Sequence, residues 1–202
     1  MKTTFLFFPI LLLFLSTYSI CSSADASPDA VRDMDGDILR TGVEYYILPG
    51  FRGMGGGVTL ASTRNESCPL DVVQAQLETD NGNLPLTFTP VDPKKGVIRE
   101  STDLNIEFQG ATICIQSLVW KLDYYDGEYV VSTRGTKGNP GIKTLDSWFK
   151  IEKYLNNYKF VFCPTVCNTC KPVCGDIGIS IRDGFRRLVL SDKPFMVKFL
   201  KA

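Results

Sequence analysis

Four closely spaced cysteines are the residues of this sequence best placed to do chemistry. They lie in VFCPTVCNTCKPVCGD (161–176) with Cys-x3-Cys-x2-Cys-x3-Cys spacing. In a reducing compartment such thiols would be tested first as zinc ligands, and the central Cys-x2-Cys pair also has the spacing of a thiol–disulfide redox site. The compartment in which the chain folds determines whether these cysteines bind zinc, act in redox chemistry or form structural disulfides.

The N-terminus predicts an oxidising compartment. MKTTFLFFPILLLFLSTYSICSSADA has one early charge, Lys2, then an apolar run, and then small residues that include Ser22 and Ala24. This is the pattern of a secretory signal peptide, and the apolar run is too short for a membrane span. We expect a signal peptide at residues 1–24 and a single mature domain at residues 25–202, with no membrane segment.

Secretion changes the chemistry expected of the cysteines. Of the seven in the chain, Cys21 lies within the predicted signal peptide, and six remain. An even number in a secreted chain predicts three disulfides, and a redox motif would need a thioredoxin-like βαβ context. The sequence alone leaves the pairing open. The six are Cys68, Cys114, Cys163, Cys167, Cys170 and Cys174.

The rest of the composition argues against an enzyme and against a protein that binds nucleic acid or a membrane surface. The chain has no histidine, which removes the commonest general base and metal ligand. Asp33, Asp35 and Asp37 lack the Gly and Glu spacing of a calcium loop, and GMGGG (53–57) lacks the helix that would follow a phosphate site. We expect a solvated acidic turn and a loop with unusual backbone angles at these places, and no metal or cofactor. The balance of 22 basic and 22 acidic residues creates no field of one sign.

Two short polar motifs suggest contact with other molecules. Lys94 and Lys95 stand in TPVDPKKGVIRES (89–101) between apolar runs. By composition this stretch is a processing site, a solvated loop, or a loop that another protein binds. Asn65-Glu66-Ser67 is an N-glycosylation sequon in a polar stretch, which predicts a glycan on an exposed Asn65.

The elements that position these motifs are predicted to be β-strands. Short runs rich in Val, Ile, Phe, Tyr and Thr alternate with turn residues such as Asn81-Gly82 and Asp126-Gly127 about every ten residues. About a dozen such runs predict an all-β fold, either two layers or a barrel with a cap. Residues 25–33 are expected to form a loose arm. Four aromatic residues are expected to fill or cap the core: Trp120, Tyr124, Tyr125 and Trp148.

Several stretches, taken in order and at their spacing, carry a family resemblance. DGDILRTGVEYYILP (35–49) opens the domain, CPLDVVQ (68–74) follows a loop, and SDKPFMVKF (191–199) closes it. These segments resemble the plant Kunitz inhibitor family, of which soybean trypsin inhibitor is the type member, over nearly all of residues 31–200. RTGVEYYILP, KGNPG and FCPTVCNTC are most similar to the miraculin-like branch.

The resemblance implies a fold and a disulfide pairing. The fold is a β-trefoil of twelve strands, six in a barrel and six in three capping hairpins, with pseudo-threefold symmetry. The implied disulfides are Cys68–Cys114, Cys163–Cys174 and Cys167–Cys170. The cysteine that links subunits in the miraculin-like branch aligns near Leu155, so we expect a monomer without an inter-chain disulfide.

The resemblance also implies a substrate-like loop for a serine protease. In inhibitory relatives this loop lies between the fourth and fifth strands, which places it here at VDPKKGVIRES (91–101). Lys94 aligns with the residue that fills the protease's primary pocket, and the scissile bond aligns with Lys94–Lys95. A lysine suits a trypsin-type pocket with an acid at its base. The remaining loop residues are Asp92, Pro93, Gly96 and Val97.

Three departures from the inhibitory pattern bear on the strength of inhibition. Relatives commonly place an asparagine beneath the loop, where this chain has the shorter Thr41. An apolar or small residue is more usual at the position of Lys95, and Gly96 adds freedom where rigidity is needed. Two functions are therefore expected: a secreted trypsin-directed inhibitor in plant defence, in the apoplast or the vacuole, or a weakly inhibitory or non-inhibitory binding protein. A cysteine-protease target bound through another loop and a carbohydrate-binding trefoil are further alternatives.

Overall fold

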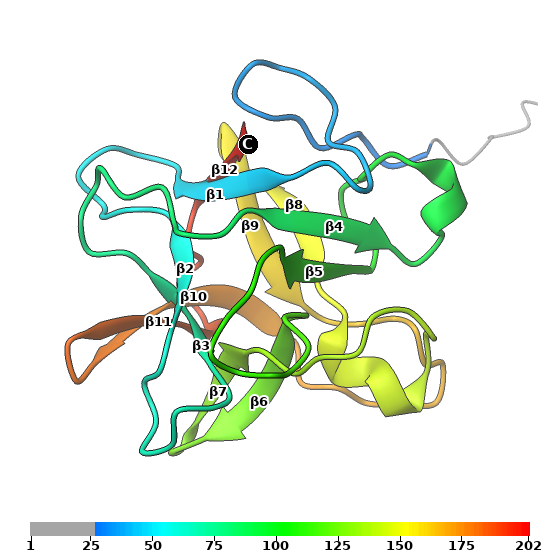
Figure 1. Cartoon of the computed structure of the whole chain (residues 1–202). Helices are drawn as coiled ribbons and strands as arrows, with labels where there is room; N and C mark the ends of the chain where they lie inside the picture. Colours follow the sequence, from blue (N-terminus) through cyan, green and yellow to red (C-terminus); the bar gives the residue numbers. More distant parts are fainter. Residues whose placement is uncertain (1–26) are drawn as a thin grey trace, which may run out of the picture.

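The structure, a computed structural model, describes residues 27–202, and the predicted signal peptide lies outside the described residues. Twelve strands and two short 3-10 helices make up this part of the chain (Figure 1). The strands are β1 (Tyr45–Pro49), β2 (Val58–Ala61), β3 (Asp71–Gln74), β4 (Leu86–Pro90), β5 (Leu104–Phe108), β6 (Lys121–Tyr125), β7 (Glu128–Ser132), β8 (Lys150–Tyr154), β9 (Asn157–Phe162), β10 (Gly175–Arg182), β11 (Phe185–Ser191) and β12 (Val197–Lys201). The 3-10 helices are η1 (Pro93–Lys95) and η2 (Ile142–Ser147). Within residues 27–202 no helix is long and apolar enough to cross a membrane.

Six of the strands form a closed barrel. β1 pairs with β4 and β12, β4 pairs with β5, and β9 pairs with β8 and β12. The ring closes where Leu104 of β5 and Phe149, the residue before β8, exchange two main-chain hydrogen bonds of 2.8 and 2.9 Å. Closure removes the unpaired strand edges that would otherwise invite association with other chains.

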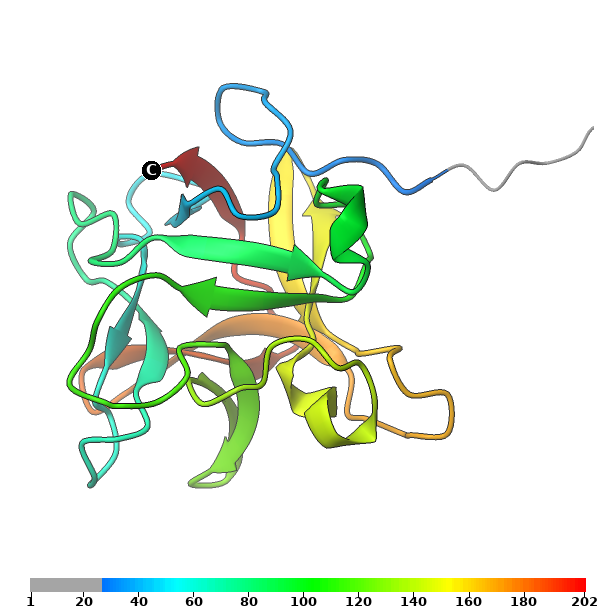
Figure 2. The same cartoon turned by 45° about the vertical axis from the view of Figure 1, so that its right-hand side comes forward.

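The other six strands form three hairpins, β2–β3, β6–β7 and β10–β11, which lie together below the barrel strands in Figures 1 and 2. Each hairpin pairs with both of the others, because β3 pairs with β7 and β11, and β7 pairs with β11. Three equivalent hairpins in mutual contact give the pseudo-threefold arrangement of a β-trefoil. The all-β fold with a barrel and a cap is therefore confirmed.

Aromatic side chains fill the barrel. Trp120 is fully buried, and its ring centroid lies 5.7 Å from that of Phe149 and 5.2 Å from that of Phe160. Phe199 packs edge-on against Phe88 with their centroids 5.5 Å apart. Edge-to-face pairs add roughly 0.5–1.5 kcal/mol each beyond the contribution of buried area, so this cluster is a major source of stability.

Two predictions from the sequence are wrong, one about Tyr124 and one about the N-terminal arm. Tyr124 is 64% exposed on the outer side of β6 instead of lying in the core. Within the predicted loose arm, Ala30 pairs with Arg99, and Val31 is fully buried. The polar composition of the arm concealed this, because main-chain pairing and one buried apolar side chain are enough to fix a short segment.

The aromatic cluster can be tested with Trp120→Ala. Because this change removes one of the two largest fully buried side chains, we expect the free energy of unfolding to fall by about 3–5 kcal/mol. Urea denaturation followed by fluorescence or circular dichroism measures this. Ile142→Ala, at an exposed position of η2, should change the free energy by less than about 0.5 kcal/mol. Equal losses in the two variants would contradict the assignment of Trp120 to the core.

Candidate functional site

The two adjacent lysines lie on an exposed turn between β4 and β5. The turn is η1, a single 3-10 turn at the upper right of Figure 1. Asp92 caps it, because its carboxylate accepts a hydrogen bond from the Lys94 N–H at 3.3 Å. Gly96 ends the turn in the left-handed conformation with φ 65°, which glycine adopts without a steric penalty.

Both lysine side chains are exposed. The Lys95 Nζ lies 4.0 Å from the Asp92 carboxylate, and an ion pair this long at the surface contributes little. Lys94 has no salt bridge to any residue in the range 27–202. Its ammonium is therefore free to meet a carboxylate of another molecule.

Main-chain hydrogen bonds fasten the chain that follows the turn. Ile98 lies between two N-terminal segments: its N–H donates to the Leu39 carbonyl, and its own carbonyl accepts from the Val31 N–H, each at 3.0 Å. The Thr41 N–H donates to the Gly96 carbonyl at 3.1 Å. Because Ile98 is fully buried, this side of the loop is fixed to the core.

The chain that precedes the turn is fixed where the barrel closes. The Val91 N–H donates to the Asp103 carbonyl at 2.8 Å, and Asp103 directly precedes Leu104. The Asp103 carboxylate accepts hydrogen bonds from the N–H and the hydroxyl of Thr165, so the cysteine-rich loop is attached to the same point. The part of the loop without such contacts is short, residues 92–95.

Thr41, the residue expected beneath the loop, supports it with its main chain and not with its side chain. The Thr41 hydroxyl is buried and has no hydrogen-bond partner in the described part of the chain. A buried polar group without a partner costs roughly 1–3 kcal/mol. The conformation of the turn is therefore maintained by the Asp92 side chain and by main-chain hydrogen bonds within the turn.

The 3-10 turn differs from the shape in which a protease binds a substrate. A substrate lies extended and pairs with the enzyme through its main chain, whereas a 3-10 turn uses those groups internally. Substrate-like binding must replace the Asp92–Lys94 and Pro93–Gly96 hydrogen bonds with contacts to the enzyme. Both bonds are long, 3.3 and 3.4 Å, so little is lost when they break.

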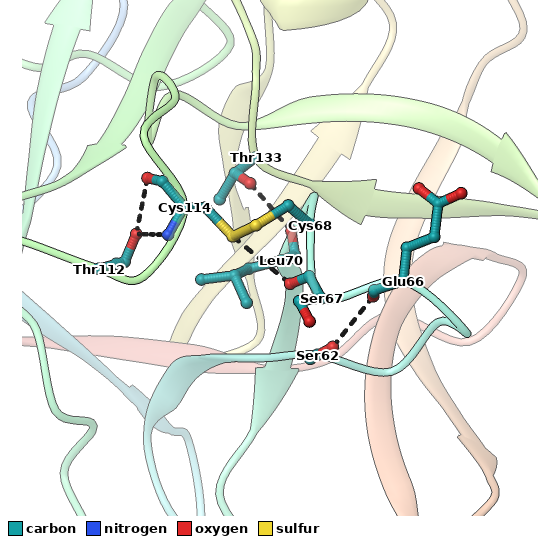
Figure 3. The surroundings of a disulfide bond; sticks show 8 residues. All are labelled: Ser62, Glu66, Ser67, Cys68, Leu70, Thr112, Cys114 and Thr133. Atoms are coloured by element: carbon teal, nitrogen blue, oxygen red, sulfur yellow. Dashed lines mark hydrogen bonds between the residues drawn. A yellow bond between two sulfur atoms is a disulfide. The ribbon is translucent and has the colours of Figure 1, made fainter.

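The six cysteines form three disulfides: Cys68–Cys114, Cys163–Cys174 and Cys167–Cys170. This is the pairing that the family resemblance implies. Figure 3 shows the first, which joins the β2–β3 and β5–β6 loops; the Thr112 hydroxyl donates to the Cys114 carbonyl and accepts from its N–H. The bridge spans 46 positions, and closing a loop of this length stabilises a fold by about 4 kcal/mol in the chain-entropy model.

The predicted glycosylation site, Asn65, is exposed in the β2–β3 loop. Its neighbour Arg64 anchors this loop, because the guanidinium bonds to Asp71 at 2.8 Å and to Asp123 at 2.9 Å and lies 4.4 Å from the centre of the Tyr125 ring. A glycan on Asn65 would thus project from a fixed segment.

The acidic cluster and the glycine-rich segment have structural roles. The Asp33 carboxylate accepts hydrogen bonds from the N–H groups of Asp35 and Asp37 at 3.0 and 2.9 Å, as in an Asx turn. Gly53 and Gly55 have φ 80° and 95°, the unusual angles expected of this loop. Within residues 27–202 no group of three or more potential metal ligands occurs.

The residues that join the N-terminal segment to the loop were not predicted from the sequence. Arg40 pairs with Val97, and the Arg99 guanidinium donates to the Pro28 carbonyl at 2.7 Å. The Tyr45 hydroxyl accepts a hydrogen bond from the Arg40 N–H at 3.1 Å. No local pattern marks these residues, since Pro28 and Arg99 are 71 positions apart and the contacts are largely to the main chain.

Known proteins resemble this chain along most of its length. A family profile described as trypsin and protease inhibitor, of the Kunitz legume type, matches residues 31–201. The chain is 49% identical to miraculin of Synsepalum dulcificum (96% of this chain, 93% of the relative) and 44% identical to Kunitz trypsin inhibitor 5 of Arabidopsis thaliana (100% of both). Among solved structures it is similar to a Kunitz-type cysteine protease inhibitor from potato (TM-score 0.76, 36% identity, 87% of this chain and 98% of that one) and to soybean trypsin inhibitor (TM-score 0.70, 36% identity, 86% and 100%).

Tyr45 gives a test of how the N-terminal segment is held. Burial raises the pKa of Tyr45 above 10.0, although the hydrogen bond from Arg40 opposes this. The unfolded chain ionises first, so the contribution of Tyr45 to stability is complete below about pH 10 and is lost as the pH rises through the folded-state pKa. Urea denaturation at pH 9 and pH 11 should therefore show a larger loss of stability for the wild type than for Tyr45→Phe. Parallel losses would exclude this role.

Proposed function

The chain belongs to the Kunitz family of trypsin and protease inhibitors, and from this membership we propose that it is a secreted inhibitor of trypsin-like serine proteases. Members of this family are inhibitors and not enzymes. We assign the contact to the loop at residues 91–101, with Lys94 in the primary pocket and Lys94–Lys95 as the scissile bond. One observation carries the proposal: a lysine without an ion pair in the described chain lies on a short exposed turn whose two flanks are fixed to the core.

The charge of Lys94 would supply the specificity. A trypsin-type primary pocket has a carboxylate at its base, and an ammonium that reaches it forms a charge-assisted hydrogen bond about twice as strong as a neutral one. Because the Lys94 ammonium has no internal salt bridge to break within residues 27–202, only its hydration must be replaced.

The fixed flanks would make the loop an inhibitor instead of a substrate. After cleavage of the Lys94–Lys95 bond, the Val91–Asp103 and Thr41–Gly96 hydrogen bonds would keep both new ends in place. The amine of Lys95 would then stay beside the acyl group on the enzyme and re-form the peptide bond before water reacts. Binding without a large ordering cost keeps such a complex long-lived.

Weak or absent inhibition is the second candidate function. The unpartnered Thr41 hydroxyl and the 3-10 shape of the turn favour it, because both leave residues 92–95 free to open. A loop that opens after cleavage would release its ends, and the protein would then be digested at this bond.

The biological setting that we propose is secretion by a plant cell, into the apoplast or the vacuole, in defence against foreign proteases. Asn65 would carry a glycan. The protein would act as a monomer, since Leu155 stands at an exposed hairpin tip where the linking cysteine of the miraculin-like branch aligns.

Lys94→Ala tests the assigned contact. Titration of the purified mature protein against trypsin should show stoichiometric inhibition for the wild type and a rise in the inhibition constant of at least about 100-fold for the variant, since a buried charged anchor dominates such interfaces. Lys143→Ala removes an exposed lysine from η2 and should inhibit as the wild type does. Full trypsin activity in a large excess of wild-type protein would refute the proposal.

Thr41→Asn separates the two candidate functions. We expect the longer amide side chain to donate to the turn a hydrogen bond that the Thr41 hydroxyl does not make, which should rigidify residues 92–95. We expect slower cleavage at Lys94–Lys95 during prolonged incubation with trypsin, by about tenfold for one added hydrogen bond, as measured by mass spectrometry. Unchanged cleavage would show that the main-chain contacts alone determine the lifetime of the loop.

A further inference from the structure

A polar hollow lies between the N-terminal segment and the β8–β9 hairpin. Residues 32–36 form one wall of it and the hairpin tip forms another, near the top of Figures 1 and 2. Its volume is about 470 Å³, which is within the range of sites for small organic molecules. No residue of the lysine turn lines it, so this hollow is separate from the proposed protease contact.

Three cationic side chains line this hollow: Arg32, Lys153 and Lys198. None of these three cations forms a salt bridge within residues 27–202. The lining contains one carboxylate, that of Asp33, which accepts hydrogen bonds from two main-chain N–H groups of its own turn. Because a cleft lined mainly by one sign of charge concentrates the opposite charge, the hollow favours an anion.

Two of the cations are already held in place. The Arg32 guanidinium donates to a main-chain carbonyl of its own segment at 2.7 Å, and the Lys153 ammonium lies 4.5 Å from the centre of the Tyr158 ring. The backbone of the N-terminal wall is fixed to β12, because the Met34 N–H donates to the Phe199 carbonyl at 2.9 Å. Side chains that are held in advance lose less conformational entropy when a ligand binds.

A buried hydroxyl group in the lining adds a hydrogen-bond donor. Tyr158 is 6% exposed, and its oxygen accepts a hydrogen bond from the Arg32 N–H at 3.0 Å. A phenol also donates through its own proton, and within the described residues that proton has no acceptor. Because buried polar groups are normally hydrogen-bonded, an oxygen atom of a bound anion would complete the bonding of this hydroxyl.

The rest of the lining favours a small molecule that carries hydroxyl groups. Asn156 and Asn157 supply amides, which hydrogen-bond to hydroxyl groups, and Met34 is the one large aliphatic side chain. An adjoining hollow of about 360 Å³ is lined by the acidic residues Asp29 and Glu100. These carboxylates repel an anion that extends toward them, so the ligand is expected to carry its charge at one end.

We propose that this hollow binds a small polyol that carries one phosphate or sulfate group. The anionic oxygens would accept hydrogen bonds from the three cations and from the Tyr158 hydroxyl, and bonds between charged partners are about twice as strong as neutral ones. The hydroxyl groups of the polyol would contact the amides of Asn156 and Asn157. This binding goes beyond protease inhibition and does not depend on it, since the lysine turn takes no part.

Isothermal titration calorimetry of the mature protein at low ionic strength tests the proposal. We expect saturable binding of glucose 6-phosphate and glucose 6-sulfate, and no binding of glucose. Lys153→Gln and Lys198→Gln should each raise the dissociation constant at least about fivefold, because each removes one charge-assisted contact. Lys143→Gln, which neutralises an exposed lysine of η2 outside the hollow, should bind as the wild type does. Absence of binding by both esters, or equal weakening in Lys143→Gln, would overturn the proposal.

Two further ligands test the size and the charge of the molecule that binds. Inorganic phosphate should bind more weakly than glucose 6-phosphate, and equal affinity would overturn the assignment of a polyol. A heparin hexasaccharide should bind no more tightly than glucose 6-sulfate, because Asp29 and Glu100 oppose an extended anion. Binding more than about tenfold tighter would instead indicate a surface for long polyanions and would overturn the proposal.

The binding assay contains no protease, so its result is independent of the trypsin-directed function. Lys153→Gln and Lys198→Gln should inhibit trypsin as the wild type does, whereas Lys94→Ala should bind glucose 6-phosphate with unchanged affinity. Weaker binding of glucose 6-phosphate by Lys94→Ala would contradict the separation of the two sites.

Discussion

The barrel and the loops attached to it depend on the pair of hydrogen bonds between Leu104 and Phe149. It closes the barrel, so no strand edge remains between β5 and β8. It also fixes Asp103, the preceding residue, whose carbonyl binds Val91 and whose carboxylate binds Thr165. The base of the lysine turn and the cysteine-rich loop are thereby attached to the same closure, so the position of the candidate site is set by the geometry of the barrel.

The two exposed loops of this molecule are supported by different physical means. The lysine turn has fixed flanks and main-chain contacts, but the hydroxyl beneath it is unpartnered in the described chain. The glycine-rich loop has a buried amide beneath it and an arginine behind that amide. A rigid binding loop loses less conformational entropy when it associates with a partner. The affinity of such a loop therefore depends on how its backbone is supported as well as on which side chains it exposes.

Much of the fold was accessible from the sequence, because strand composition and turn residues are local signals. The number of runs left two forms open, two layers or a barrel with a cap, whereas the trefoil and the disulfide pairing came from the family resemblance and not from spacing. Ala30–Arg99 pairing was missed, since it joins distant segments through the main chain. The role of Gln74 could not be predicted either, because a polar residue in a strand is normally expected to face solvent. Only the folded structure shows that its amide contacts the Met54 carbonyl of a distant loop.

The N-terminal segment has a practical consequence for anyone who handles this protein. Pro28 and Asp29 bond to Arg99 and Glu100, a few positions after the lysine turn. An affinity tag or carrier domain joined just ahead of Pro28 would therefore emerge next to the loop that we propose binds a protease. Such a fusion would weaken protease binding by steric hindrance, even though it lies far from Lys94 along the chain.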